Sequence, residues 1–143
     1  MNIFCLSECP NESARWLVDK HVVKMLLESL QMMSTVADYL GLQGPYKPVM
    51  LNHPCTIWAR ESSENFSWLW QHAIAISETY TDRYGKRHKS AMSMMKHNHV
   101  WKEVLELLPK TGQTDFAVAI SPNMRCRYLP GFEELSTVEK YRA

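Results

Sequence analysis

The sequence predicts an all-α protein that forms a single compact domain, residues 1–143. Apolar residues recur at the 3.6-residue period of an amphipathic helix through residues 11–40 and again through 63–84, and a glycine follows each stretch. Strand signals are weak, because the candidate at residues 117–120 is too short to form a sheet alone. We therefore expect one long N-terminal helix, about 11–40, packed against a second long helix, about 63–84.

The first of these helices organises the chain. Asn11 can serve as its N-cap and Gly41 as its stop, and 30 helical residues would span about 45 Å. The opposite side from the apolar face carries one row of polar residues at spacings of three and four. The apolar face comprises Val18, Val22, Met25, Leu26, Leu30, Met33, Val36, Ala37 and Leu40, and the polar row comprises His21, Lys24, Glu28, Gln31 and Thr35.

The remaining elements are shorter. Residues 2–6 form an apolar segment that is extended or tucked under the first helix, and the glycines and prolines of residues 41–53 indicate a loop. Pro54 suits the first turn of a new helix with His53 at or near its cap, and Ser62 or Ser63 can cap the 63–84 helix. We expect a helical region over 88–108 with a break near 96–98, an irregular tail over 111–131, and a last helical turn over 136–142.

Composition narrows the class of protein. Hydrophobic residues make up 45% of the chain, which argues against disorder, and no apolar run reaches the roughly 18 residues of a membrane span. We expect a soluble cytoplasmic protein whose four cysteines are reduced thiols. The net charge of +1 provides no general attraction for nucleic acid, so a polyanion must be held by a local basic patch.

The polar row allows two interpretations. His21, Lys24 and Glu28 can form an ordinary solvated helix face with favourable charge spacing. Alternatively they line a pocket in which the two basic groups keep the carboxylate ionised and able to exchange a proton. The spacing alone does not decide between them.

A second group of residues suggests metal or anion binding. Its histidines and cysteines are of the types that ligate zinc, but no pair has a standard zinc spacing, so we expect no metal and no other cofactor. Polar residues at the start of the helix-compatible run 54–60, including His53 and the nearby Arg60, are instead suited to an anion at a helix N-terminus. The histidines and cysteines concerned are Cys5, Cys9, His53, Cys55, His97 and His99.

The third group is the one dense basic stretch, residues 80–89, where Arg83, Lys86 and His88 alternate with tyrosines. Cations at a helix C-terminus are favoured by the helix dipole alone. They also suit phosphate contacts, in which case a nearby exposed aromatic ring could stack on a base. The tryptophans at positions 58, 68 and 70 are most simply core residues.

Asp19-Lys20-His21, followed by Glu28 seven residues after the histidine, resembles the first helix of the phage pyrimidine-dimer DNA glycosylases of the endonuclease V type. The family has Asp-Gln-His and its catalytic Glu at the same offset. His53, Thr56 and the apolar pair after it are similar to the family's next block, and residues 138–141 resemble its aromatic C-terminus. The strings DKHVVKM, NHPCTIWARESSEN and YTDRYGK look closer still to a group of small phage proteins.

The resemblance implies a small all-α enzyme that acts on DNA. In such an enzyme the α-amine of the chain attacks C1′ of a deoxyribose, displaces the base and forms an imine, after which the strand is cleaved by elimination. Met1 would then carry the amine, Glu28 would support the sugar cation and transfer protons, and His21 would line the pocket. Lys24, His53, Arg60, Arg83, Lys86 and His88 are the expected phosphate or nucleic-acid contacts.

Two departures from the family pattern bear on the substrate. The family exposes a threonine amine by removing its initiator methionine, whereas Asn2 follows Met1 here, and methionine is not normally removed before asparagine. The family also has arginines immediately before its Glu and three residues after it, where this chain has Leu27 and Gln31. The scaffold and the Glu are therefore expected to be kept while the substrate differs.

Three functions follow. The first is a DNA glycosylase and AP lyase acting on a damaged or modified pyrimidine. The second is an enzyme that processes a free or modified nucleotide on the same scaffold. The third is a non-catalytic phage protein that binds a host factor, which would place it in the host cytoplasm. The sequence leaves the oligomeric state open.

Overall fold

The computed structural model describes residues 3–117, 131 and 135–142, and these residues contain helices and no strand. The all-α prediction is therefore confirmed for this part of the chain. The expected strand candidate at 117–120 falls mostly outside the described residues. The helices are α1 (Pro10–Arg15), α2 (Asp19–Tyr39), α3 (Pro54–Glu61), α4 (Ser63–Tyr84), α5 (Lys89–Lys96), α6 (Asn98–Leu107) and α7 (Thr137–Arg142).

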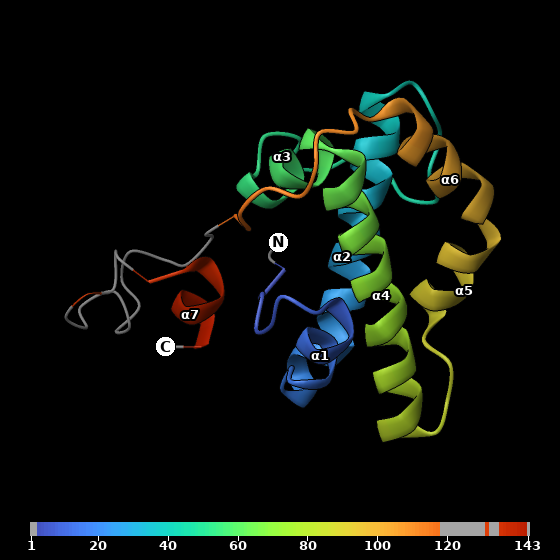
Figure 1. Ribbon diagram of the computed structural model, residues 1–143. Coiled ribbons are helices and arrows are strands. Elements are labelled where there is room, and N and C mark those ends of the chain that lie inside the picture. Colours follow the sequence, from blue (N-terminus) through green and yellow to red (C-terminus); the bar gives the residue numbers. More distant parts are fainter. Residues whose placement is uncertain (1–2, 118–130, 132–134, 143) are drawn as a thin grey trace.

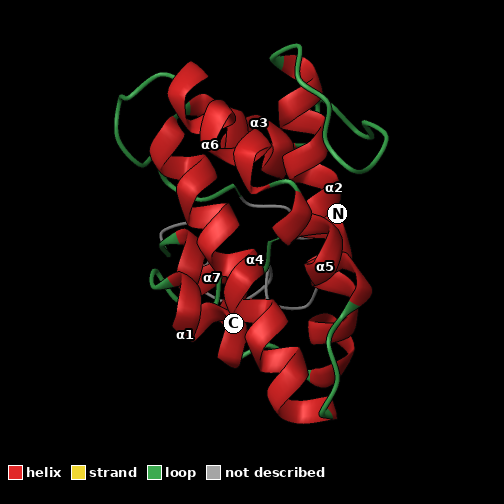
Figure 2. Ribbon diagram, turned by 90° about the vertical axis from the view of Figure 1, so that its right-hand side faces the viewer, coloured by secondary structure: helices red, strands yellow, loops and turns green. Residues whose placement is uncertain are grey.

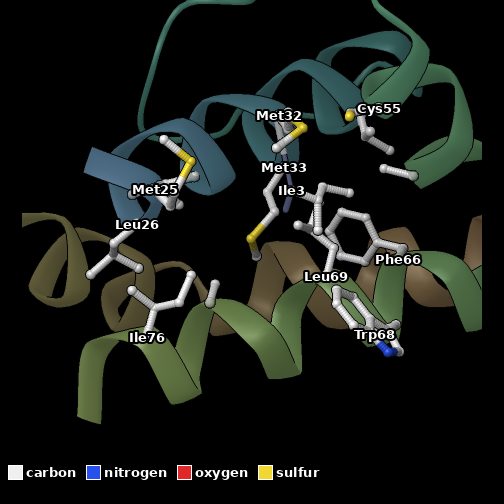
Figure 3. Packing of buried hydrophobic residues seen from close by; sticks show 14 of the residues in the cluster. Ile3, Met25, Leu26, Met32, Met33, Cys55, Phe66, Trp68, Leu69 and Ile76 are labelled. Atoms are coloured by element: carbon white, nitrogen blue, oxygen red, sulfur yellow. The ribbon is translucent and has the colours of Figure 1, made fainter. Parts of the chain in front are cut away.

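Helices α2 and α4 lie side by side through the length of the molecule, with α5 and α6 on one side and the start of the chain on the other (Figure 1). Their facing sides form the core, in which Leu26 and Met33 of α2 meet Leu69 and Ile76 of α4 (Figure 3). All four side chains are fully buried. Burial of such side chains contributes about 1.5–3 kcal/mol each to stability.

The predicted long first helix is wrong at its start, because the chain breaks between α1 and α2. Helix α1 begins at Pro10 after an N-cap at Cys9, so Asn11 is not the cap. Val18 has the extended backbone angles φ −67° and ψ 157° and is 60% exposed, although the apolar pattern assigned it to the core. Leu17 is buried in its place.

The guanidinium of Arg83, at the end of α4, stabilises this break. It donates hydrogen bonds to the carbonyl oxygens of Arg15 and Leu17 and to the carboxylate of Asp19, each at 2.9 Å. The last carbonyls of a helix have no partner within the helix, and Arg83 provides one for the end of α1. Because Arg83 is more than 60 residues away along the chain, the local pattern gave no sign of this contact.

The boundaries of α3 and α4 follow their predicted caps. The Nδ1 atom of His53 accepts a hydrogen bond from the backbone N–H of Cys55 at 3.1 Å, and the hydroxyl of Ser62 accepts one from Asn65 at 3.1 Å. Gly85 ends α4 with φ +69°, a left-handed conformation in which glycine has no steric penalty.

The C-terminal helices also match their predictions. The region after His88 is divided at His97 into α5 and α6, and α6 ends before Pro109. Helix α7 is a short helix near the start of the chain, away from α5 and α6 (Figures 1 and 2). No helix in the described residues is long and apolar enough to cross a membrane.

Arg83→Ala tests the role of Arg83 in the break between α1 and α2. The substitution removes three hydrogen bonds from a charged donor, so we expect the free energy of unfolding to fall by about 1–3 kcal/mol. Urea denaturation measures this change. Arg87→Ala, which removes an exposed arginine one turn later, is the control and should change the stability by less than about 0.5 kcal/mol. Equal effects of the two substitutions would contradict the assignment.

Candidate functional site

The first described residues of the chain are packed into the protein. We call residues 3–6 the N-terminal arm. The side chains of Ile3 and Cys5 are 2% and 1% exposed, and Ile3 lies among core side chains of α2 and α4 (Figure 3). The backbone of Ile3 also forms a hydrogen bond with the thiol of Cys55 on α3. The expectation of an apolar segment tucked under the first helix is thereby confirmed.

Phe4 joins the arm to the polar row of α2. Its ring stacks on the imidazole of His21 with a centroid distance of 4.2 Å and an interplanar angle of 12°. The Phe4 backbone has φ +54°, a conformation that is strained for a residue with a side chain. The hydroxyl of Ser13 holds it by donating to the Phe4 carbonyl at 3.3 Å and accepting from the Leu6 N–H at 3.0 Å.

Helix α7 contacts the same arm. The ring of Tyr141 meets Phe4 edge-on at 6.1 Å, and Nε of Arg142 donates to the carbonyl oxygen of Leu6 at 2.7 Å. The Arg142 guanidinium also lies over the ring of Trp16 at 4.9 Å. The two ends of the described chain therefore pack against each other beside α1.

Glu28 lies on the same row of α2 as His21, two helical turns further on. Its side chain is half-buried and its Oε2 atom is shielded from solvent. Burial lowers the pKa of His21, the Lys20 and Lys24 charges lower it as well, and the Glu28 carboxylate raises it. The charge of Glu28 therefore acts on the proton affinity of His21, its neighbour two turns earlier in the same row.

The charge of the same carboxylate also acts on His53, the N-cap residue of α3. Burial lowers the pKa of His53, and the charge of Glu28 opposes this effect. Since Nδ1 of His53 accepts the Cys55 N–H, the neutral imidazole carries its proton on Nε2. His21, Glu28 and His53 therefore form one group, which we call the carboxylate cluster, next to the N-terminal arm.

The far end of the polar row does not face solvent as predicted. Lys24 is exposed, but Thr35 is fully buried. The Thr35 hydroxyl lies 2.8 Å from the carbonyl oxygen of Gln31 and accepts the backbone N–H of Val49 at 3.0 Å. The loop before α3 covers this part of α2, and a sequence pattern does not show which loop lies over which helix face.

The other predicted basic residues are spread over the molecule. Arg60 donates to the carbonyl oxygen of Leu51 and lies 4.8 Å over the ring of Tyr39. His88 caps α5 through Nδ1, and its Nε2 lies 3.0 Å from the carbonyl oxygen of Val23. Arg83 braces the break between α1 and α2 as described above, and Lys86 is exposed in the turn after α4. Met1 is outside the described residues.

Three cysteines lie in the described part of the chain, all of them free thiols: Cys5 and Cys55 are buried and Cys9 is exposed. Burial raises the pKa of Cys55 to about 11, and burial also raises the pKa of Cys5. Both are therefore protonated near neutral pH, which makes them poor nucleophiles and poor metal ligands. Within the described part of the chain no three histidine, cysteine or acidic side chains are grouped so as to hold a metal ion.

His72 is a functional candidate that the sequence analysis missed. It is fully buried on α4, and burial lowers its pKa to about 4. Its Nδ1 atom lies 3.0 Å from the carbonyl oxygen of Pro10, and its ring stacks on Trp68 at 4.8 Å. A neutral His72 thus anchors the start of α1, although its position on a regular helix carried no sequence signal.

Comparison with known proteins gives one match. A family model described as pyrimidine dimer DNA glycosylase matches residues 1–93, which span the N-terminal arm, α1 to α4 and the first half of α5. The matched region includes His21, Glu28 and His53. No curated protein matches the chain, and no solved structure matches it.

Glu28→Gln tests the carboxylate cluster. Because the Glu28 charge raises the pKa of both His21 and His53, its removal should lower both pKa values further. NMR titration of the imidazole Cε1–H signals measures the change. The matched control is Glu78→Gln on the exposed side of α4, which should leave both titrations as they are. Unchanged His21 and His53 titrations in the Glu28 variant would show that the cluster does not exist.

Proposed function

The chain belongs to the pyrimidine dimer DNA glycosylase family, and on this premise we propose that it removes a damaged or modified pyrimidine from DNA and then cleaves the strand at the resulting site. The α-amine of Met1 is the proposed nucleophile. Glu28 is the proposed proton-transfer group, and His21 lines the pocket. Family membership supports DNA as the substrate and base excision as the reaction, and the residue roles are our own proposal.

The observation that carries the proposal is the position of the N-terminal arm. Ile3 is buried and Phe4 stacks on His21, in the same helical row as Glu28. Two residues of extended chain reach at most about 7 Å, so the proposal needs the α-amine to act within that distance of Ile3. This supports an amine that works beside the Glu28 carboxylate rather than at a distant surface.

The chemistry suits these two groups. A reference pKa near ~8 leaves part of an α-amine unprotonated at neutral pH, so its lone pair can attack C1′ of the deoxyribose. The bond between C1′ and the base breaks with its electron pair going to the base, which takes up a proton. The amine loses its protons as the sugar ring opens, and an imine to C1′ results. Removal of a proton from C2′ then expels the 3′ phosphate.

Glu28 contributes to several of these steps. Its carboxylate stabilises the positive charge that develops on the sugar as the base leaves, and in a half-buried position that attraction is stronger than in water. It can also accept the amine proton and return it to the sugar oxygen. His53, with its neutral ring and Nε2 proton, is suited to donate a hydrogen bond to a phosphate or sugar oxygen.

Phosphate contacts divide into two groups. Lys24 is exposed one turn before Glu28, and Arg60 keeps donors in addition to the one used on Leu51. These two are the proposed phosphate contacts next to the carboxylate cluster. Lys86 is exposed as well, in the turn after α4. The side chains of Arg83 and His88 are engaged within the protein, and we propose no phosphate contact for them.

Borohydride trapping on an oligonucleotide with an abasic site tests this function. Borohydride reduces the imine to a stable protein–DNA adduct, so we expect an adduct with the wild-type chain. Glu28→Gln should reduce its rate of formation about a hundredfold or more, a typical loss for a catalytic proton-transfer group. Glu78→Gln is the matched control and should trap as the wild type does.

The alternatives give other results. If the wild type forms no adduct but free nucleotides raise its melting temperature, an enzyme that acts on nucleotides is supported and the DNA lyase is ruled out. If neither occurs, the catalytic proposal fails. If Glu28→Gln traps at the wild-type rate, the function survives but the assignment of Glu28 is wrong.

A further inference from the structure

The loop before α3 ends in three consecutive exposed apolar residues, Val49, Met50 and Leu51. We call them the apolar tip. Their exposed fractions are 37%, 57% and 41%, which is uncommon for three adjacent large apolar residues in a folded protein. Exposed apolar clusters lower the solubility of a protein, and packing within the protein does not explain this one.

The apolar tip is held rigidly despite its exposure. The backbone N–H of Val49 donates to Thr35, and the carbonyl oxygen of Met50 accepts the N–H of His53 at 3.0 Å. The Arg60 guanidinium bonds the carbonyl oxygen of Leu51. The backbone of Val49 is therefore bonded to α2 and that of Leu51 to α3, Met50 closes a turn with the residue that caps α3, and the three side chains are left exposed.

Met50 is also strained. Its φ of +49° is a left-handed conformation that costs a residue with a side chain about 1–3 kcal/mol. A glycine or asparagine would occupy this position with little or no penalty. Met50 is both strained and the most exposed of the three residues of the apolar tip. This combination suggests that its side chain has a function.

The tip lies beside the carboxylate cluster. Thr35, which holds Val49, is seven residues after Glu28 in the same row of α2, about 10 Å along the helix axis. His53 belongs to the cluster and bonds the carbonyl oxygen of Met50.

The geometry points to the apolar tip as a wedge that enters the base stack of duplex DNA next to the lesion. This inference rests on the proposed function, because it takes duplex DNA as the ligand. An enzyme that attacks C1′ needs a distorted duplex, and apolar side chains such as Met and Leu inserted between base pairs produce one. Arg60, bonded to the tip and stacked on Tyr39, can hold a phosphate beside the opened step.

The wedge also fits the charge of the protein. With a net charge of +1, the chain cannot rely on many phosphate contacts to distort the duplex. Insertion of apolar side chains supplies contacts that do not depend on charge.

The double variant Met50→Ala/Leu51→Ala tests the wedge. Its matched control is Met92→Ala/Met95→Ala, which removes two exposed methionines of α5. We expect the ratio of trapping rates on duplex and single-stranded abasic oligonucleotides to fall about tenfold or more in the tip variant, since only the duplex must be unstacked. The control should keep the wild-type ratio.

A second measurement separates this inference from the chemistry. This measurement uses the Glu28→Gln variant and a duplex with 2-aminopurine opposite the abasic site. The fluorescence of the 2-aminopurine should increase on binding, because the base loses its stacking. The tip substitutions should abolish this increase. An unchanged ratio, or an unchanged increase, would overturn the wedge even if trapping is normal. A fluorescence increase that depends on the tip, with no trapping by the wild-type chain, would support the wedge and reject the lyase chemistry. Absence of any binding to duplex DNA would reject both.

Discussion

Burial of Ile3 is the interaction on which the site depends. The side chain packs among α2 and α4, its backbone contacts Cys55, and its burial contributes about 1.5–3 kcal/mol. That gain is similar in size to the cost of the left-handed conformation at Phe4, about 1–3 kcal/mol. The core thus offsets the strain that turns the Phe4 ring onto His21. Without the anchor, the start of the chain would be a free end.

The carboxylate cluster shows how one helix row acquires two functions. Near its start, the row is partly open and holds His21, Lys24 and Glu28 beside the N-terminal arm. Near its end, the row is covered, and Thr35 holds the loop that carries the apolar tip. Because a helix is stiff, the distance between these two parts is fixed by their separation of seven positions along α2. Glu28 and Thr35, the residue that holds the apolar tip, are therefore kept at a constant separation.

Local patterns predicted much of the fold. Periodicity and caps gave α3 to α6 almost to the residue, because Ser62 and Gly85 act on their immediate neighbours. The break at Val18 escaped prediction, since a distant Arg83 stabilises it. The helical periodicity of apolar residues continues through this break, so the periodicity did not indicate that the helix is interrupted there.

The candidate site was predictable in part, for the same reason. Glu28 and His21 stood out because their spacing matches a family motif, and His53 stood out as a cap. The positive φ angles of Phe4 and Met50 could not be predicted from the sequence, because aromatic and aliphatic residues rarely adopt such angles. Buried His72 and Thr35 looked like ordinary helix positions, and their roles depend on segments that fold against them from elsewhere.

The most direct test of the account is to identify the nitrogen that carries the trapped DNA. Proteolysis of the borohydride-reduced adduct, followed by mass spectrometry of the modified peptide, distinguishes the α-amine of Met1 from the side-chain amines of Lys20 and Lys24. The account predicts that the sugar remnant is on the amino terminus of the chain. A remnant on either lysine, with the terminal amine unmodified, would contradict it.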